Sequence, residues 1–237
     1  MRLVTWNLGH PLDGGHALDA VMMALTALEP DVAILTEHLA ATAHRSFLLS
    51  LAGVGLMHQL PATRSQRGHH VVIASRLELR PGSLGADAQD DHRPPPNVLH
   101  AYAPWGLLDV LGLRSPETGS RPAGSRGDWP WLVRAATAMR ERRAILIGDF
   151  DAAAEGERAE SADHLRHFSA EGWTHAVPAD GASYHTASGQ PSRLDHAYLS
   201  PSLKKIDARY AVAAAGFRLS GSRDALSDQP ALVVDLQ

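Results

Sequence analysis

The first 37 residues carry the pattern of a strand, a helix and a second strand. Residues 3–8 and residues 31–37 are short runs rich in aliphatic side chains, which is typical of buried strands. Between them, residues 17–28 place apolar side chains at helical spacing, and this run ends at Glu29-Pro30, where proline stops a helix. A packed sheet with a covering helix is therefore expected from the start of the chain.

Short apolar runs continue along the chain and predict further strands at residues 70–75, 98–103, 144–147, 194–199, 206–214 and 231–236. Two more helices are expected at residues 131–142 and 161–170, and surface loops at residues 88–96 and 114–129. Many strands with few helices between them favour an α+β layered architecture over a regular βα repeat. Because strands on both sides of each loop are needed for the sheets, residues 1–237 are interpreted as one domain.

The composition limits the chemistry that the chain can perform. With 44% hydrophobic and 20% charged residues, it is typical of a folded globular protein. Since there is no cysteine, thiol catalysis, disulfides and Cys-bound zinc are excluded, and any metal must be held by oxygen or imidazole ligands. No secretory signal or membrane span is recognisable, so a cytoplasmic protein is expected. The net charge of −4 argues against broad electrostatic attraction to nucleic acid.

Acidic and amide residues recur at the ends of the predicted strands, where α/β scaffolds usually present an active site. They are Asn7, Glu37, Asp149, Asp151, Asp195 and Asp228. Each of them alone is more often a turn former or a helix cap than a catalyst. Only their number and their order along the chain point to function.

Taken together, these residues and their neighbours resemble the endonuclease/exonuclease/phosphatase family. Thr5-Trp6-Asn7 is similar to the opening strand of that family, and Glu37 to its metal-binding glutamate. Further along, the family elements Tyr-x-Pro, Gly-Asp-Phe-Asn, Arg-Ile-Asp-His and Ser-Asp-His are matched by Tyr102-Ala103-Pro104, Gly148-Asp149-Phe150-Asp151, Arg193-Leu194-Asp195-His196 and Ser227-Asp228-Gln229.

The resemblance implies a fold, a reaction and residue roles. The fold would be a two-layer β-sandwich flanked by helices, a DNase I-like four-layer α/β sandwich. The reaction would be Mg²⁺- or Mn²⁺-dependent hydrolysis of a phosphate ester. A phosphodiester is a more suitable substrate than a phosphomonoester, and nucleic acid is among the candidate substrates. A monomeric protein is expected. The resemblance assigns the metal to Asn7, Glu37 and Asp228, activation of water to Asp149, a phosphate contact to Tyr102, and orientation of the closing motif residue to Asp195.

Two positions depart from the family pattern. The closing histidine is Gln229, which has no positive charge and no ionisable proton. The asparagine that follows the catalytic aspartate is Asp151, an acceptor-only carboxylate where a phosphate would lie, unless it ligates a second metal. Among the 14 histidines, His100 is the first candidate to replace the missing imidazole, because it points to the same side of its strand as Tyr102.

These departures leave an alternative function open. The chain could be a catalytically impaired relative that binds a phosphorylated ligand or a protein partner. The remaining carboxylates oppose this hypothesis, because a binding module would have little physical reason to gather so many mutually repelling groups.

Overall fold

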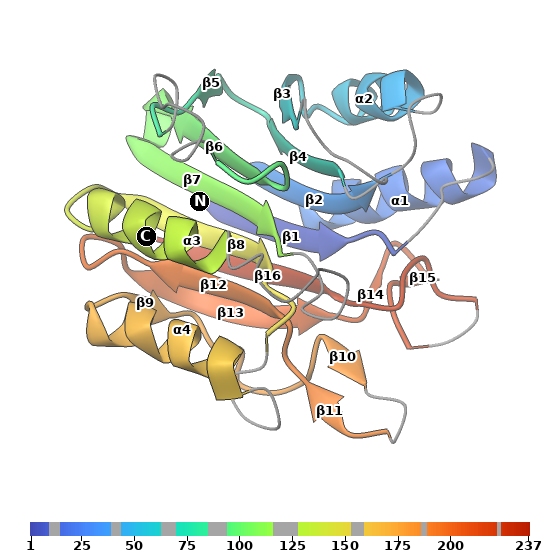
Figure 1. Ribbon diagram of the computed structural model, residues 1–237. Helices are drawn as coiled ribbons and strands as arrows, with labels where there is room; N and C mark the ends of the chain where they lie inside the picture. The colour runs from blue at the N-terminus through green and yellow to red at the C-terminus, as the bar shows by residue number, and fades with distance from the viewer. Residues whose placement is uncertain are drawn as a thin grey trace.

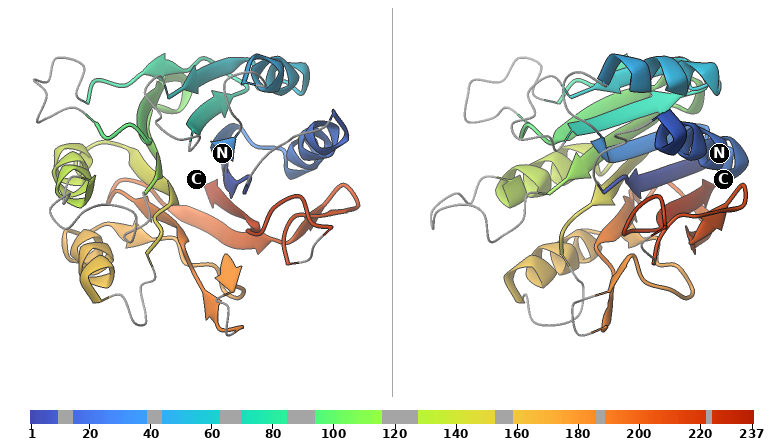
Figure 2. Two further views of the ribbon diagram at one scale, coloured as in Figure 1. Left: turned by 45° about the vertical axis from the view of Figure 1, so that its right-hand side comes forward. Right: turned by 90° about the vertical axis from the view of Figure 1, so that its right-hand side faces the viewer.

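Two β-sheets stack face to face in the protein, and helices cover both outer faces (Figures 1 and 2). The structure is a computed structural model, and it describes residues 1–9, 15–38, 44–62, 70–84, 94–115, 128–152, 159–185, 189–221 and 224–237. This arrangement is the two-layer β-sandwich flanked by helices that the family resemblance implies.

The first sheet has six strands in the order β13-β16-β1-β2-β4-β3. Strands β1 and β2 run parallel, and helix α1 connects them, as the opening of the chain predicts. The other neighbours in this sheet are antiparallel. The bounds are β1 Arg2–Asn7, α1 Gly15–Leu28, β2 Val32–His38, α2 His44–Gly53, β3 His58–Pro61, β4 His70–Ser75, β13 Lys205–Ala211 and β16 Ala231–Leu236.

The second sheet also has six strands, in the order β5-β6-β7-β8-β12-β9. Strands β7 and β8 are its parallel pair, and helix α3 lies between them in the chain. The bounds are β5 Arg80–Pro81, β6 Val98–Ala103, β7 Leu108–Arg114, α3 Asp128–Met139, β8 Ala144–Asp149, α4 Ala159–Ala170, β9 Thr174–His175 and β12 Asp195–Leu199. Short elements complete the described chain, namely η2 Pro104–Gly106, β10 Tyr184–His185, β11 Pro191–Ser192, β14 Ala213–Ala214 and β15 Phe217–Arg218.

Three apolar clusters hold the layers together. One fills the space between the two sheets and includes Leu3, Ile34 and Ile147. The second joins the outer face of the first sheet to α1 and α2, and the third joins the outer face of the second sheet to α3 and α4. Strand β1 contributes Leu3 to the cluster between the sheets and Trp6 to the cluster under α1 and α2. Because both of its faces are buried, the strand is a nearly continuous apolar run.

Most of the predicted strands and helices are present. Strand β7 and helix α2 were not predicted, and neither were the short strands β3, β5, β9, β10, β11 and β15. The single strand expected over residues 206–214 is divided into β13 and β14. Most residues of the two loops expected at 88–96 and 114–129 lie outside the described residues.

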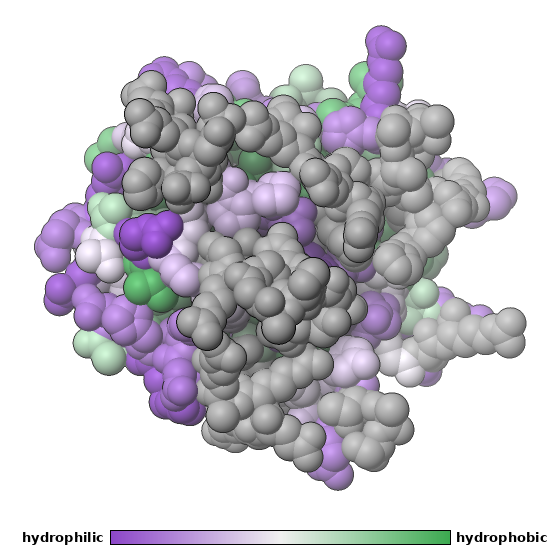
Figure 3. Space-filling view, viewed as in Figure 1, coloured by the Kyte–Doolittle hydropathy of each residue, from purple (hydrophilic) through white to green (hydrophobic). Residues whose placement is uncertain are grey.

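On the face of the molecule drawn in Figure 3, hydrophilic side chains predominate, and the apolar ones are scattered among them. Within the described chain, no helix combines the length and the hydropathy needed to cross a membrane.

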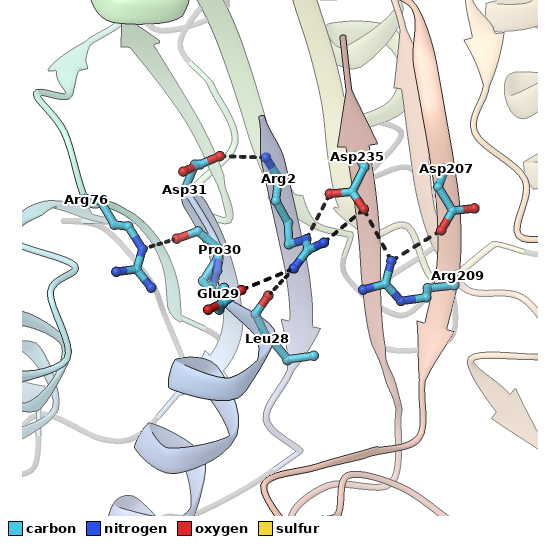
Figure 4. Close-up of polar contacts among 9 residues, drawn as sticks. All are labelled: Arg2, Leu28, Glu29, Pro30, Asp31, Arg76, Asp207, Arg209 and Asp235. Carbon is cyan, nitrogen blue, oxygen red and sulfur yellow. Dashed lines mark hydrogen bonds and ion pairs between the residues drawn. The ribbon is translucent and has the colours of Figure 1, made fainter.

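An ion-pair network joins neighbouring strands of the first sheet at the end where β1 begins (Figure 4). The Arg2 Nε donates to Asp235 Oδ1 at 2.8 Å, and Arg209 Nη1 lies 3.3 Å from Asp235 Oδ2. The backbone N–H of Arg2 donates to the Asp31 carboxylate at 2.7 Å. The network thus links β1 to β16, to β13 and to the residue that precedes β2.

We expect Asp235→Asn to lower the free energy of unfolding by about 1 kcal/mol, because the partly buried carboxylate accepts charged hydrogen bonds from two arginines. Urea denaturation at pH 7 measures the change. Glu78→Gln is the matched control, since it removes one partner of the exposed ion pair with Arg80 and should change stability little. Equal effects of the two substitutions would contradict a stabilising role of the network.

Candidate active site

The carboxyl ends of four strands meet at one end of the sandwich. In the first sheet the parallel pair β1 and β2 ends near Asn7 and Glu37, and in the second sheet the parallel pair β7 and β8 ends at Arg114 and Asp149. Strand β1 packs against β8 across the sheet interface. The Asn7 Nδ2 therefore donates to Asp149 Oδ2 at 2.9 Å, although the two residues are 142 positions apart.

Glu37 occupies an irregular position at the end of β2. The pairing register with β4 shifts between Thr36 and His38, and Glu37 has a φ of +52°. A positive φ is uncommon for a residue with a long side chain and is often found where function requires a fixed geometry. The bulge turns the Glu37 carboxylate toward β7, where Arg114 Nε and Nη2 lie 2.9 and 2.8 Å from Glu37 Oε1.

Asp149 is buried and hydrogen-bonded at both carboxylate oxygens. Asn7 donates to Oδ2, and the backbone N–H of Asp151 donates to Oδ1 at 2.9 Å. Burial raises the pKa of Asp149 to about 6, and the Asp151 charge adds to this rise. The Arg114 guanidinium and the two hydrogen bonds act in the opposite direction and lower it. Asp151 has a φ of +45°, so the turn after β8 is strained at the same place as the bulge in β2.

Asp195 stands beside Asp149 on the neighbouring strand. The two residues are register partners in the antiparallel pair of β12 and β8. Both carboxylate oxygens of Asp195 are buried and have no hydrogen-bond partner among the described residues. Burial and the Asp149 charge raise the pKa of Asp195 well above its usual range. The backbone is nevertheless fixed, because Ser183 Oγ accepts its N–H and Tyr210 donates to its carbonyl.

The closing motif, Ser227-Asp228-Gln229, lies against the end of β1. The Ser227 hydroxyl donates to the Asn7 carbonyl at 2.6 Å, and the Trp6 indole N–H donates to the Gln229 carbonyl at 3.0 Å. Gly9 has a φ of +62°, and a Cβ added there would lie 2.7 Å from Asp228 Oδ1. Glycine is required at this position, since it lets the Asp228 carboxylate approach the turn after Asn7 closely.

Tyr102 and His100 are not brought to this group. Strand β6 runs antiparallel to β7, and Tyr102 pairs with Asp109, five positions before Arg114, which is a distance of about 16 Å along the strand. His100 pairs with Leu111, and its Nε2 lies 2.7 Å from Asp109 Oδ1, so its imidazole is engaged away from Gln229. Because β6 runs antiparallel to β7, both residues lie away from Asn7 and Asp149, and the contacts expected of them with the phosphate are not supported.

A family model supports the assignment that the motifs suggest. The model of the Endonuclease/Exonuclease/phosphatase family matches residues 4–228. The chain belongs to this family. Membership places it among hydrolases of phosphate esters. Among curated proteins, no sequence matches the chain.

Solved structures of low sequence identity share the fold. An endonuclease/exonuclease/phosphatase family protein from Leptotrichia buccalis is 12% identical with a TM-score of 0.68, covering 100% of this chain and 99% of that chain. The 3' phosphatase NExo from Neisseria, bound to a product DNA hairpin, is 18% identical with a TM-score of 0.68 and the same coverage. The beta toxin from Staphylococcus aureus is 14% identical with a TM-score of 0.67, covering 100% of both chains.

Arg114 is the site residue that the sequence analysis missed. Its side chain is 7% exposed, and its Nη1 also donates to the Ser115 carbonyl at 2.8 Å. The missed signal is the group of apolar residues within residues 108–113, which belong to the buried strand β7 that ends at Arg114. Because β7 was not recognised, Arg114 was interpreted as the start of a loop.

The donor set suits a hard divalent cation of the kind that the family implies. Glu37, Asn7 and Asp228 offer carboxylate and amide oxygens, which Mg²⁺ and Mn²⁺ prefer. Within the described residues, no three His, Asp or Glu side chains form a complete cage for an ion, so water would have to complete the coordination, as is usual for Mg²⁺. Burial is the main cause of the raised pKa of Asp195, and the charges of Asp149, Asp228 and Glu37 raise it further. A cation would relieve the repulsion among these carboxylates.

The buried His196 and the half-buried His175 fix the chain after Asp151. The His196 Nε2 lies 2.7 Å from the Ala152 carbonyl, and its Nδ1 lies 2.9 Å from His175 Nε2. Burial lowers the pKa of His175 to about 3 and the pKa of His196 to about 4. Both imidazoles are therefore neutral at pH 7, and the contact with Ala152 restrains the turn that carries Asp149 and Asp151.

This pair should make the native state sensitive to acid. Below pH 6.5 the unfolded chain protonates both histidines while the native state does not, so their contribution to stability falls as the pH drops from 6.5 toward 4. Between pH 7 and pH 5 we expect His196→Gln to lose less stability than the wild type, by about 1 to 2 kcal/mol.

Urea denaturation of the wild type and of the variant at both pH values measures this difference. The comparison is needed because the raised pKa of Asp149 changes the stability of the wild type in the opposite sense. The control His58→Gln changes an exposed histidine and should follow the wild type. An identical pH dependence of His196→Gln and wild type would show that His196 is not held neutral.

Proposed function

We propose that the chain hydrolyses a phosphodiester with Mg²⁺ or Mn²⁺ held by Asn7, Glu37 and Asp228, and with water activated by Asp149. The observation that carries the proposal is the hydrogen bond between Asn7 and Asp149. It brings a candidate metal ligand from the first sheet into contact with a candidate base from the second sheet. Glu37 reaches the same place through Arg114, whose Nε lies 4.0 Å from Asp149 Oδ2.

The Asp149 carboxylate is oriented for a defined proton transfer. Its two oxygens accept hydrogen bonds from Asn7 Nδ2 and from the Asp151 N–H, so neither oxygen can rotate away without losing a partner. A carboxylate oxygen can accept more than one hydrogen bond, which leaves capacity for a water molecule. Asp149 would orient this water toward the phosphorus and accept its proton as the water attacks.

A phosphodiester resists this attack because its own negative charge repels the nucleophile. A bound divalent cation would supply the positive charge that polarises the phosphate oxygens and stabilises the leaving alkoxide. Asn7 and Glu37 would hold that cation beside the water that Asp149 orients. The buried position of Asp149, whose side chain is 4% exposed, keeps bulk solvent from competing for the carboxylate.

A nucleic acid strand is one phosphodiester substrate that suits this proposal. The NExo structure that shares the fold was solved with a DNA hairpin product. The net charge of −4 favours contacts made at the site over attraction to the duplex as a whole. The expected cytoplasmic location and the expected monomer stay predictions.

Hydrolysis of bis-p-nitrophenyl phosphate should require Mg²⁺ or Mn²⁺ and should stop when EDTA removes the metal. In the presence of metal, Asp149→Asn should lower kcat by about 10²-fold or more, because the water loses its base while the side-chain volume is preserved. The matched control is Asp109→Asn, which changes a buried aspartate at the other end of β7 and should leave kcat near that of the wild type.

Thermal melting of both variants shows whether the fold is intact. A loss of only a few-fold in kcat for Asp149→Asn would remove Asp149 as the base. If the wild type hydrolysed no diester, monoester or nucleic acid, the proposed activity would fail, and a protein that only binds phosphorylated ligands would become the better interpretation.

Gln229→His should raise diester hydrolysis by about 10-fold. Gln229 is buried and its Oε1 has no partner among the described residues, as is also true of both carboxylate oxygens of Asp195. An imidazole at position 229 could donate to an acidic acceptor and present a cationic N–H to the phosphate. Initial rates of wild type and variant at saturating Mg²⁺ test the prediction. A lower rate in the variant would show that Gln229 belongs to a site adapted to another reaction.

A further inference from the structure

We propose that Arg114 is the residue that binds the phosphate of the substrate, and that its guanidinium supplies the positive charge absent at Gln229. This inference rests on the proposed function and names a substrate contact within it. Arg114 lies outside all the sequence motifs that resemble the family.

The position of Arg114 is the first argument. It is the register partner of Asp149, and its Nε lies 4.0 Å from Asp149 Oδ2. Its Nε and Nη2 contact Glu37 Oε1 on the other side. The guanidinium therefore lies between the candidate base and a candidate metal ligand, next to the groups that would surround the phosphate in the proposed reaction.

The hydrogen-bonding capacity of the guanidinium is the second argument. An arginine side chain has five N–H donors. Glu37 Oε1 accepts one from Nε and one from Nη2, and the Ser115 carbonyl accepts one from Nη1. One N–H on each terminal nitrogen is left without a hydrogen-bond partner among the described residues. Two guanidinium donors can bind two oxygens of one phosphate.

The charge of the surroundings is the third argument. Arg114 forms an ion pair with Glu37 and lies 4.0 Å from the Asp149 carboxylate, so its positive charge is placed between two acidic residues. Glu37 holds this side chain at two nitrogens, so the guanidinium is fixed before any substrate arrives. A cation that is already oriented loses little conformational entropy on binding an anion.

Isothermal titration of inorganic phosphate into the protein with Mg²⁺ present tests the proposal without requiring turnover. Arg114→Met should weaken phosphate binding by about 10-fold or more, since a charge-assisted contact is lost. Arg114→Lys keeps a positive charge for Glu37 but lacks the paired donors of arginine. Its phosphate affinity should therefore lie between that of the wild type and that of Arg114→Met. If Arg114→Met does not fold, Arg114→Lys still gives a measurable difference from the wild type.

Arg2→Met is the matched control, because Arg2 also bridges strands through a carboxylate, at the other end of β1 (Figure 4). It should bind phosphate as the wild type does. Gln229→His combined with Arg114→Met should recover part of the lost affinity, because the new imidazole restores a cation for the phosphate. A residue that only held Glu37 in place would not be rescued in this way.

Equal phosphate affinity in wild type, Arg114→Met and Arg114→Lys would overturn the proposal, and so would a wild type that binds no phosphate. These outcomes differ from a failure of the proposed function. A protein that binds phosphate through Arg114 but hydrolyses no ester would support the contact assigned to Arg114 and contradict only the catalysis.

Discussion

The packing of β1 on β8 is the constraint on which the candidate site depends. Each sheet contains one parallel pair, and a parallel pair ends both of its strands at the same edge. Because β1 and β8 face each other across the apolar layer, the ends of both pairs meet at one end of the sandwich. The Asn7 to Asp149 hydrogen bond is the contact that results, and the other polar groups of the site are arranged around it.

The balance of charge at this end explains the unusual features of the site. The buried carboxylates Asp149 on β8 and Asp195 on β12 are register partners, and burial is the main cause of their raised pKa values. The Asp149 charge raises the pKa of Asp195 further. The Arg114 guanidinium offsets part of this charge, and hydrogen bonds from Asn7 and Asp151 offset another part. The backbone strain at Glu37 and Asp151 is found at the same place, so the fold sustains an arrangement that is not the most stable one locally.

Apart from β7, the strands of five or more residues could be predicted from the sequence, because strands buried on both faces are runs rich in apolar residues. The polar residues that end β1, β2, β8 and β12 stand out against these runs for the same reason. The arrangement of the strands in a sandwich was implied by the resemblance to the family. Strand β7 was missed since Asp109 and Gly112 interrupt its apolar pattern and turn-forming residues flank it. The direction of β6 could not be predicted either, because strand pairing is a contact between distant parts of the chain. Tyr102 was therefore expected in the site and Arg114 was not.

The most direct test of this account is the anomalous difference map of crystals soaked with Mn²⁺ and phosphate. The account predicts an Mn²⁺ peak in contact with oxygens of Glu37 and Asn7, and a phosphate that touches both the metal and the Arg114 guanidinium, within reach of a water on Asp149. An Mn²⁺ peak away from Glu37 and Asn7, or no metal bound at this end of the sandwich, would contradict it.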